Sequence, residues 1–231
     1  MTSLHTGSTK IIKSSSNKII TIDRLFDLLL ETLGEQFWWP ARSKWELLIG
    51  AVLVQNTNWT NVSLSLENLA HRTDFSPKAI RELTNQELQT LIRPSGFFNN
   101  KSRALEGILS WTETFNDDFS RLKAVPTDKI RKSLLQIKGV GPETADVIVV
   151  YLLDRPVFIA DAYARRLFTL LGKETKSYEE LQGIVHLSPS FNGTKANELH
   201  ALIDVYGKQY LRKNTKEIGF LAGYKLDQLL D

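Results

Sequence analysis

The chain contains no cysteine among its 231 residues. This absence excludes disulfide bonds, thiolate catalysis, cysteine-ligated zinc and cysteine-ligated iron–sulfur clusters. The chain also lacks a continuous apolar run of membrane-spanning length, and residues 1–18 lack the apolar centre of a secretory signal. We therefore expect a cytoplasmic protein in a reducing compartment, with no membrane contact.

Signals for β-strands are almost absent, because the run at residues 157–160 is too short to build a sheet. Residues 1–18 are rich in Ser, Thr and Lys, which predicts a mobile N-terminal tail. Beyond them, helical spacing of apolar residues recurs along the chain, and residues 43–54 are apolar on nearly every face, as in a helix at the centre of a core. The hydrophobic share of 42% suits a globular protein, so we predict an all-α fold.

The excess of one sign of charge over the other is small, since the net charge is only +3. The basic residues are nevertheless uneven, and one group precedes a glycine turn, accompanied by Asp128 alone: Arg121, Lys123, Lys129, Arg131, Lys132 and Lys138. Such a group is typical either of a solvated helix face or of a surface for an acidic partner. The sequence leaves both interpretations open.

The turn itself comprises residues 138–144, with Gly139 and Gly141 on either side of Val140 and Pro142 at the first position of the next helix. Glycine-rich backbone adopts such a turn easily, and proline is favoured at the start of a helix. The free N–H groups of a turn and helix start converge on one point, which suits a phosphate. A purely structural joint between two helices is the alternative.

Asp161 lies twenty residues beyond Gly141, at the start of an amphipathic helix. Aspartate is among the best N-cap residues, so capping alone explains its place. A carboxylate fixed in a cleft between two lobes is the functional interpretation. Both can hold together, because a capping Asp is held rigidly and ionised.

These elements together resemble a known family. The turn and the aspartate read LLQIKGVGPETAD and DRPVFIADAYARRLF, which is similar to the helix–hairpin–helix and following Asp of the endonuclease III superfamily of DNA glycosylases. The resemblance extends back through SKWELLIGAVLVQNT and PSGFFNNKSRAL, and so covers roughly residues 43–167. Several separate motifs in the right order make it specific.

The resemblance implies two helical lobes with double-stranded damaged DNA bound in the cleft between them. One lobe would span residues 41–154, and the other would combine residues 19–40 with 155–231. It implies that Asp161 is the catalytic carboxylate, that Gln55 fills the gap left by a flipped nucleotide and that Phe97 wedges beside the opposite base. Gln55 as a helix-end cap and Phe97 as core are the structural alternatives. The remaining DNA contacts would come from the hairpin: Lys138, Gly139, Val140, Gly141 and Thr144.

Two departures from the family pattern narrow the expected chemistry. Bifunctional members carry a lysine directly before the Thr-Ala pair of the second hairpin helix, whereas this chain has Glu143 before Thr144 and Ala145. No amine is available there to form a Schiff base with the sugar. Members with an iron–sulfur cluster also have four cysteines, which this chain lacks. We therefore expect a cluster-free enzyme without strand-cleaving activity.

The same departures resemble the 3-methyladenine DNA glycosylase branch, which shares a WWP run, a QNT run with an aromatic residue two positions later, and RPSGF. The implied substrate is an alkylated purine, whose positive charge makes it leave readily and stack on electron-rich rings. The candidate base pocket comprises Trp38, Trp39, Pro40, Trp59, Glu143 and Lys208. Ordinary core packing is the alternative for the tryptophans. For Glu143 the sequence favours an acid at a helix N-terminus over a second catalytic group. Lys208 would contact either phosphate or a nearby carboxylate.

The predicted function is therefore removal of alkylated purines such as 3-methyladenine by a monofunctional glycosylase of base excision repair. The open alternatives are a mismatch glycosylase acting on thymine, uracil or adenine, and a non-catalytic binder of damaged DNA. We expect no cofactor and no metal held by side chains. The family resemblance suggests a monovalent cation on hairpin carbonyls. It further suggests a monomer, associated with the nucleoid if the source is bacterial.

Overall fold

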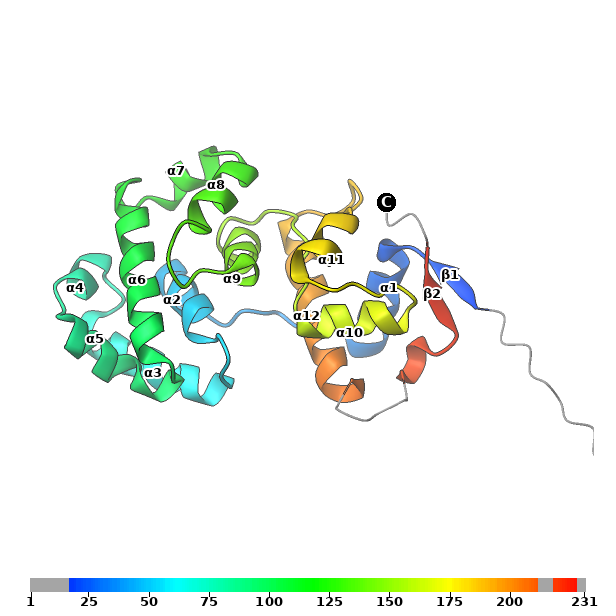
Figure 1. Cartoon of the computed structure of the whole chain (residues 1–231), viewed down its shortest axis with the longest axis horizontal. Helices are drawn as coiled ribbons and strands as arrows, with labels where there is room; N and C mark the ends of the chain where they lie inside the picture. The colour runs from blue at the N-terminus through cyan, green and yellow to red at the C-terminus, as the bar shows by residue number, and fades with distance from the viewer. Residues whose placement is uncertain (1–16, 212–217, 228–231) are drawn as a thin grey trace, which may run out of the picture.

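A computed structural model describes residues 17–211 and 218–227 of the chain. Helices dominate it, which confirms the all-α prediction, and they divide into two groups (Figure 1). In chain order the elements are β1 (Lys18–Ile20), α1 (Ile22–Leu33), α2 (Lys44–Leu53), α3 (Trp59–Thr73), α4 (Pro77–Arg81), α5 (Asn85–Ile92), the 3-10 turn η1 (Arg93–Ser95), α6 (Phe98–Glu113), α7 (Phe119–Ala124), α8 (Thr127–Leu134), α9 (Pro142–Val147), the π-helical η2 (Ile148–Leu152), α10 (Ala162–Leu170), α11 (Tyr178–Ile184), α12 (Gly193–Tyr210), the 3-10 turn η3 (Gly219–Leu221) and β2 (Tyr224–Leu226).

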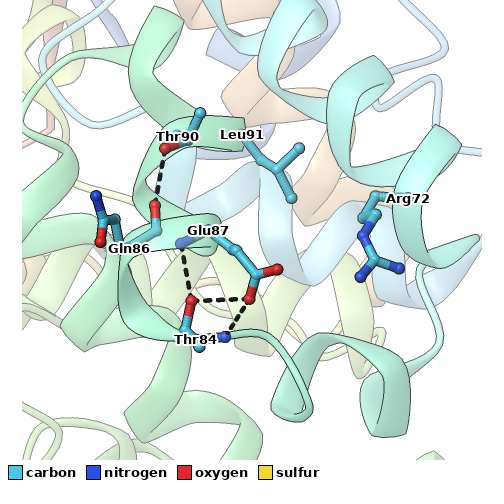
Figure 2. Close-up of a pocket in the computed structure, with 6 residues that line it drawn as sticks. All are labelled: Arg72, Thr84, Gln86, Glu87, Thr90 and Leu91. Atoms are coloured by element: carbon cyan, nitrogen blue, oxygen red, sulfur yellow. Dashed lines mark hydrogen bonds between the residues drawn. The ribbon is translucent and has the colours of Figure 1, made fainter.

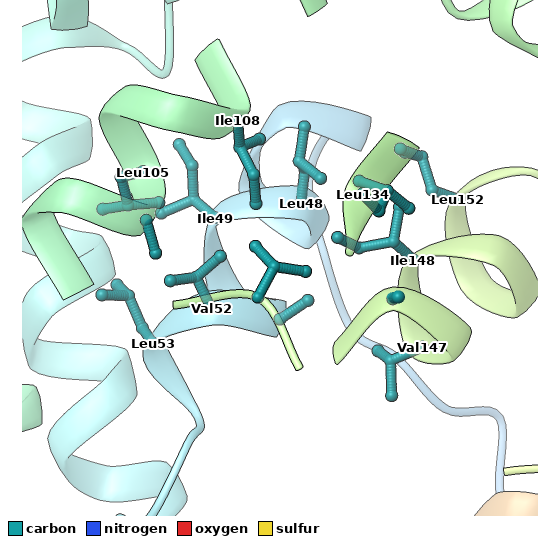
Figure 3. Close-up of a cluster of buried hydrophobic side chains, with 14 of the residues drawn as sticks. Leu48, Ile49, Val52, Leu53, Leu105, Ile108, Leu134, Val147, Ile148 and Leu152 are labelled. Atoms are coloured by element: carbon teal, nitrogen blue, oxygen red, sulfur yellow. The ribbon is translucent and has the colours of Figure 1, made fainter. Parts of the chain in front are cut away.

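The first lobe is built around α2, as the apolar run at residues 43–54 predicts. Leu48, Ile49 and Val52 of α2 are buried among side chains of α6, α8 and η2 (Figure 3). Ser43 caps this helix by accepting a hydrogen bond from the backbone N–H of Glu46. A helix with apolar residues on every face is stable only when other helices surround it, and α3, α6 and η2 do so here.

The second lobe joins the beginning of the described chain to its end. Helix α1 lies against α12, and α10 packs on the same helix (Figure 1). Gly207 of α12 permits that approach, because a Cβ atom there would lie 2.2 Å from the ring of Tyr163 in α10. The second core therefore depends on residues far apart in sequence.

The described residues also contain two short strands that the sequence does not predict. Strands β1 and β2 pair in parallel, with Lys18 opposite Tyr224. Each strand has only three residues, so this pairing does not alter the all-α class. The mobile tail predicted for residues 1–18 lies mostly outside the described residues, and Lys18 is already in β1.

The segment between the lobes runs as a single extended stretch whose side chains alternate between the two cores. Val157 and Ile159 pack in the first core, whereas Phe158 and Ala160 pack in the second. Side chains of a β-strand alternate in the same way, but this stretch pairs with no neighbouring strand among the described residues. Asp161 follows immediately, so its position relative to both lobes is set by this alternation.

A buried ion pair fixes the hairpin helices to each other and to the second lobe. Arg131 of α8 donates to both carboxylate oxygens of the fully buried Asp146 of α9, at 2.6 and 3.1 Å. The hydroxyl of Tyr178, on α11, donates to the same carboxylate at 2.8 Å. Arg131 belongs to the basic group that precedes the glycine turn, and its charge is neutralised within the fold rather than by an acidic partner.

Replacing Arg131 with methionine is expected to lower the free energy of unfolding by about 3 kcal/mol, because the buried carboxylate of Asp146 loses its counter-charge. Urea denaturation at pH 7 measures this change. The matched control is Lys132→Met, which removes a positive charge from an exposed neighbour and should alter stability by less than about 0.5 kcal/mol. Equal effects of the two substitutions would contradict the assigned role of the pair.

Candidate active site

The helix–hairpin–helix is formed by α8, the turn at residues 135–141 and α9. Gly139 has φ +92°, a conformation that favours glycine, whereas Gly141 has φ −90° and needs no special freedom. Of the two glycines, only Gly139 therefore uses the conformational freedom of glycine. A Cβ atom at Gly141 would meet nothing within 4 Å, so a ligand can approach this backbone closely. Val140 is buried and anchors the turn, while Lys138 is exposed.

Asp161 caps α10 as predicted, since its Oδ1 accepts a hydrogen bond from the backbone N–H of Ala164 at 2.7 Å. Its side chain is only 11% exposed. Burial raises the pKa of this carboxyl to about 6, and the carboxylate of Asp204 adds to the effect, while Arg165 opposes it. The sequence-based expectation of an ionised Asp161 is therefore correct only above about pH 6.

Two groups next to Asp161 are missing from the sequence-based site. His200 lies on α12 with Nε2 3.8 Å from Asp161 Oδ2, and its Nδ1 lies 2.7 Å from the hydroxyl of Tyr151. Burial lowers the pKa of His200 to about 4, so the ring is neutral at pH 7. When the Tyr151 hydroxyl donates to Nδ1, the ring proton lies on Nε2, which faces the carboxylate.

A sequence signal for this arrangement exists. His200, Asp204 and Lys208 are spaced four residues apart, which places them on one face of α12. This face of α12 is recognisable as part of a site only in the folded protein. The partners of His200 are Asp161 at the start of α10 and Tyr151 in η2, and both come from other segments of the chain.

The aromatic residues form a connected row beside Asp161. The rings of Trp39 and Trp59 lie 5.2 Å apart, edge to face, and Trp39 contacts Tyr151 at 5.6 Å. Tyr151 contacts His200 at 5.6 Å, and His200 contacts Trp38 at 6.1 Å. Trp59 is 40% exposed, so it is not ordinary core. Pro40, which follows Trp39 in the chain, is exposed.

Glu143 and Lys208 lie on α9 and α12, in opposite lobes. Partial desolvation and the carboxylate of Asp161 raise the pKa of Glu143, while Arg165 opposes the shift, so Glu143 shares the electrostatic environment of Asp161. Lys208 Nζ lies 2.5 Å from Asp204 Oδ2 and 5.2 Å from the centre of the Trp38 ring. Lys208 therefore contacts a carboxylate, which is one of the two partners that the sequence predicts for it.

Gln55 and Phe97 both lie near the hairpin side of the first lobe. Gln55 Nε2 donates to the carbonyl of Gly139 at 3.2 Å and to Thr144 Oγ1 at 2.9 Å, so its side chain contacts the hairpin rather than capping α2. Phe97 is 65% exposed with φ +46°, so it is not a core residue. Insertion of either side chain into DNA stays a prediction.

A separate pocket lies over α5. It is lined by Arg72, Thr84, Gln86, Glu87, Thr90 and Leu91 (Figure 2). Thr84 and Glu87 form a capping box. The side chain of each residue accepts a hydrogen bond from the backbone N–H of the other residue. The side chains of Thr84, Glu87 and Thr90 are thus bonded within the helix itself, and no predicted site residue lines the pocket.

Among the described residues, no cluster of three or more His, Asp or Glu side chains is arranged to hold a metal ion. None of the described helices has the length and apolarity needed to cross a membrane. An iron–sulfur cluster bound by cysteine is excluded by the absence of cysteine from the sequence.

A glycine hairpin in one helical lobe and a buried carboxylate at the start of the other are the features of a helix–hairpin–helix base-excision protein. Residues 49–189 match the HhH-GPD superfamily of base excision DNA repair proteins, and the chain belongs to that family. It is a DNA glycosylase of the endonuclease III superfamily, as the sequence motifs indicate.

Relatives agree along most of the chain. A Methanocaldococcus jannaschii protein named "Putative DNA repair glycosylase" is 37% identical over 204 residues, covering 85% of this chain and 91% of the relative. The H. pylori 3-methyladenine DNA glycosylase MagIII, solved with 1,N6-ethenoadenine, is 27% identical with a TM-score of 0.69, covering 84% of this chain and 100% of that one. Endonuclease III in a trapped covalent DNA complex is 22% identical with a TM-score of 0.68, covering 84% and 88%, and shares the fold.

Replacing Asp161 with asparagine is expected to stabilise the fold at pH 7.5 by about 2 kcal/mol, because a carboxyl with a raised pKa destabilises the folded state once it is ionised. The folded-state pKa of about 6 exceeds the unfolded value, so the wild type loses stability as the pH rises from about 4 to about 6. Urea denaturation of both proteins at pH 5 and 7.5 measures the effect, and the difference should shrink at pH 5. Asp128→Asn, at an exposed residue, is the control. An unstabilised Asp161→Asn protein at pH 7.5 would argue against a strained carboxylate.

Proposed function

We propose that this glycosylase removes alkylated purines such as 3-methyladenine from duplex DNA, without cleaving the strand. The observation that carries the proposal is the buried carboxylate of Asp161, which lies beside a row of aromatic rings and near Glu143 rather than a lysine. Similarity to MagIII supports the substrate class, since that protein is a 3-methyladenine DNA glycosylase.

The reaction needs one carboxylate at the sugar. The C1′–N bond breaks, its electron pair leaves with the base, and the cationic purine departs as a neutral molecule. The sugar becomes an oxocarbenium ion, which the charge of Asp161 stabilises. A water molecule then attacks C1′ and gives up a proton. A carboxylate whose pKa is about 6 accepts that proton more readily than one with the ordinary value.

The aromatic row supplies a surface for the flipped base. Trp59 and Trp39 belong to the first lobe's side of the row, and Trp38 lies against α12 in the second. Cationic purines are attracted to tryptophan faces, which favours this lesion class over neutral bases. The ammonium of Lys208 over Trp38 is balanced by Asp204, so it does not leave an uncompensated positive charge beside the base.

The wild-type protein is expected to release 3-methyladenine from duplex DNA, and Asp161→Asn is expected to lower the single-turnover rate by at least about 100-fold, because stabilisation of the oxocarbenium ion is lost. Base release is measured chromatographically on a panel of duplexes carrying alkylpurines, uracil, thymine opposite guanine, and adenine opposite guanine. Duplex affinity, measured by fluorescence anisotropy, is the control and should be retained.

Release from the mismatched duplexes in place of the alkylated ones would assign the enzyme to mismatch repair instead. Tight binding with no release from any duplex would indicate a non-catalytic binder. Unchanged excision by Asp161→Asn would remove Asp161 from the mechanism.

The absence of an amine at residue 143 predicts that no covalent enzyme–DNA adduct forms on treatment with borohydride, because a Schiff base requires a primary amine at the sugar. Denaturing gel electrophoresis after borohydride treatment detects such an adduct, with endonuclease III as the positive control, since it has been trapped covalently on DNA. Strand breaks should appear only after heating in alkali. An adduct with this chain would show that another amine performs the lyase step.

A further inference from the structure

Lys101 is buried in the first lobe, where a lysine is uncommon. Lys101 is only 2% exposed and lies in the first turn of α6. Lysines are rarely buried without partners, and a positive charge is unfavourable near a helix N-terminus. Burial lowers the pKa of Lys101 to about 8. Neither core packing nor helix electrostatics therefore accounts for a lysine at this place.

Two backbone carbonyls from different segments account for it. The ammonium donates to the carbonyl of Leu53 at 2.8 Å and to the carbonyl of Ser95 at 2.6 Å. Leu53 is the last residue of α2, where helix carbonyls lack intrahelical partners, and Ser95 is the last residue of η1. Each carbonyl lies two residues before a side chain predicted to probe DNA, Gln55 in one case and Phe97 in the other.

Further hydrogen bonds hold the second of these segments. The backbone N–H of Ser95 donates to Ser65 Oγ at 3.0 Å, and Ser65 Oγ donates to the carbonyl of Ile92 at 3.2 Å. The backbone N–H of Lys101 itself donates to the carbonyl of Phe97 at 3.0 Å. Ser65 and Ser95 are both fully buried, so this network excludes water and is rigid.

The hairpin meets the same end of α6. A Cβ atom at Gly139 would lie 3.0 Å from Cβ of Ala104, which places the turn against the helix surface one turn beyond Lys101. Gln55 donates to the carbonyl of Gly139. The start of α6 thus contacts all three segments predicted to meet DNA.

We propose that Lys101 is a positioning residue that couples Gln55 and Phe97, so that both enter the duplex as one preformed unit when the damaged base is turned out. This inference rests on the proposed function, because the DNA roles of Gln55 and Phe97 belong to it. A preformed pair loses little conformational freedom while the base pair opens. The ammonium acts at the opening step and makes no contact with the glycosidic bond.

The test compares one lesion in two duplexes under single-turnover conditions. In the first duplex the lesion has its normal partner base, and in the second it lies opposite an abasic site, where less energy is needed to turn it out. Lys101→Met, which keeps the length and removes the donors, should slow excision from the paired duplex by about 10-fold or more and from the unpaired duplex by less than about 3-fold.

Arg103→Met is the matched control, because it removes a positive charge from an exposed neighbour on the same turn. It should change both rates by the same factor. Ser65→Ala is the second variant, for use if Lys101→Met does not fold, since it loosens the same network by removing one small hydroxyl. It should lower the paired rate more than the unpaired rate. Equal slowing of both rates by Lys101→Met or by Ser65→Ala would overturn the proposal.

A fluorescence measurement separates this proposal from the proposed function. 2-Aminopurine placed opposite the lesion reports unstacking without any base release, and the Lys101→Met protein should produce a smaller increase on binding than the wild type does. If the wild type releases no base but the fluorescence difference remains, the proposed function fails and the coupling stands. If base release occurs and the fluorescence increase is the same for both proteins, the coupling fails and the proposed function stands.

Discussion

The position of the buried Asp161 carboxylate depends on one extended stretch of four residues. Val157 and Ile159 enter the first core while Phe158 and Ala160 enter the second, so neither end of the stretch can slide without exposing apolar side chains. Asp161 is the next residue and begins α10. The glycine turn precedes α9 and η2 in the chain, and its Val140 belongs to the first core. The alternation therefore fixes the position of the carboxylate relative to the glycine turn.

Much of this arrangement is readable from the sequence because it depends on local chemistry. Helix starts are indicated by residues whose side-chain oxygens can cap them, such as Ser43 before α2 and the pair Thr84 and Glu87 at α5. Asp161 is recognisable as an N-cap for the same reason. The apolar composition of α2 predicts its central place. Gly139 marks the positive-φ position of the turn, whereas Gly141 has an ordinary φ and open space where a Cβ atom would lie.

The rest depends on contacts between residues far apart in the chain. Nothing local to His200 or Tyr151 indicates that they meet at Asp161, because they come from α12 and η2. Lys101 and Arg131 read as ordinary surface charges, and only their buried partners show otherwise. The stretch at residues 157–160 is correctly judged too short for a sheet, yet its alternating pattern has a use that appears only once two cores exist. Tertiary burial, which sequence patterns do not specify, decides all these cases.

The joining of α1 to α12 has a consequence for synthesis of the chain. The backbone N–H of Gln36, just beyond α1, is satisfied by Glu198, 162 residues further on. At ordinary rates of translation, on the order of 10 s separates the appearance of these two residues. The apolar face of α1 must therefore remain uncovered on the ribosome while the nearly contiguous first core can already close around α2. The contact between His200 and Asp161 forms last, when α12 packs on α10, so a nascent chain lacks this arrangement until α12 has been made.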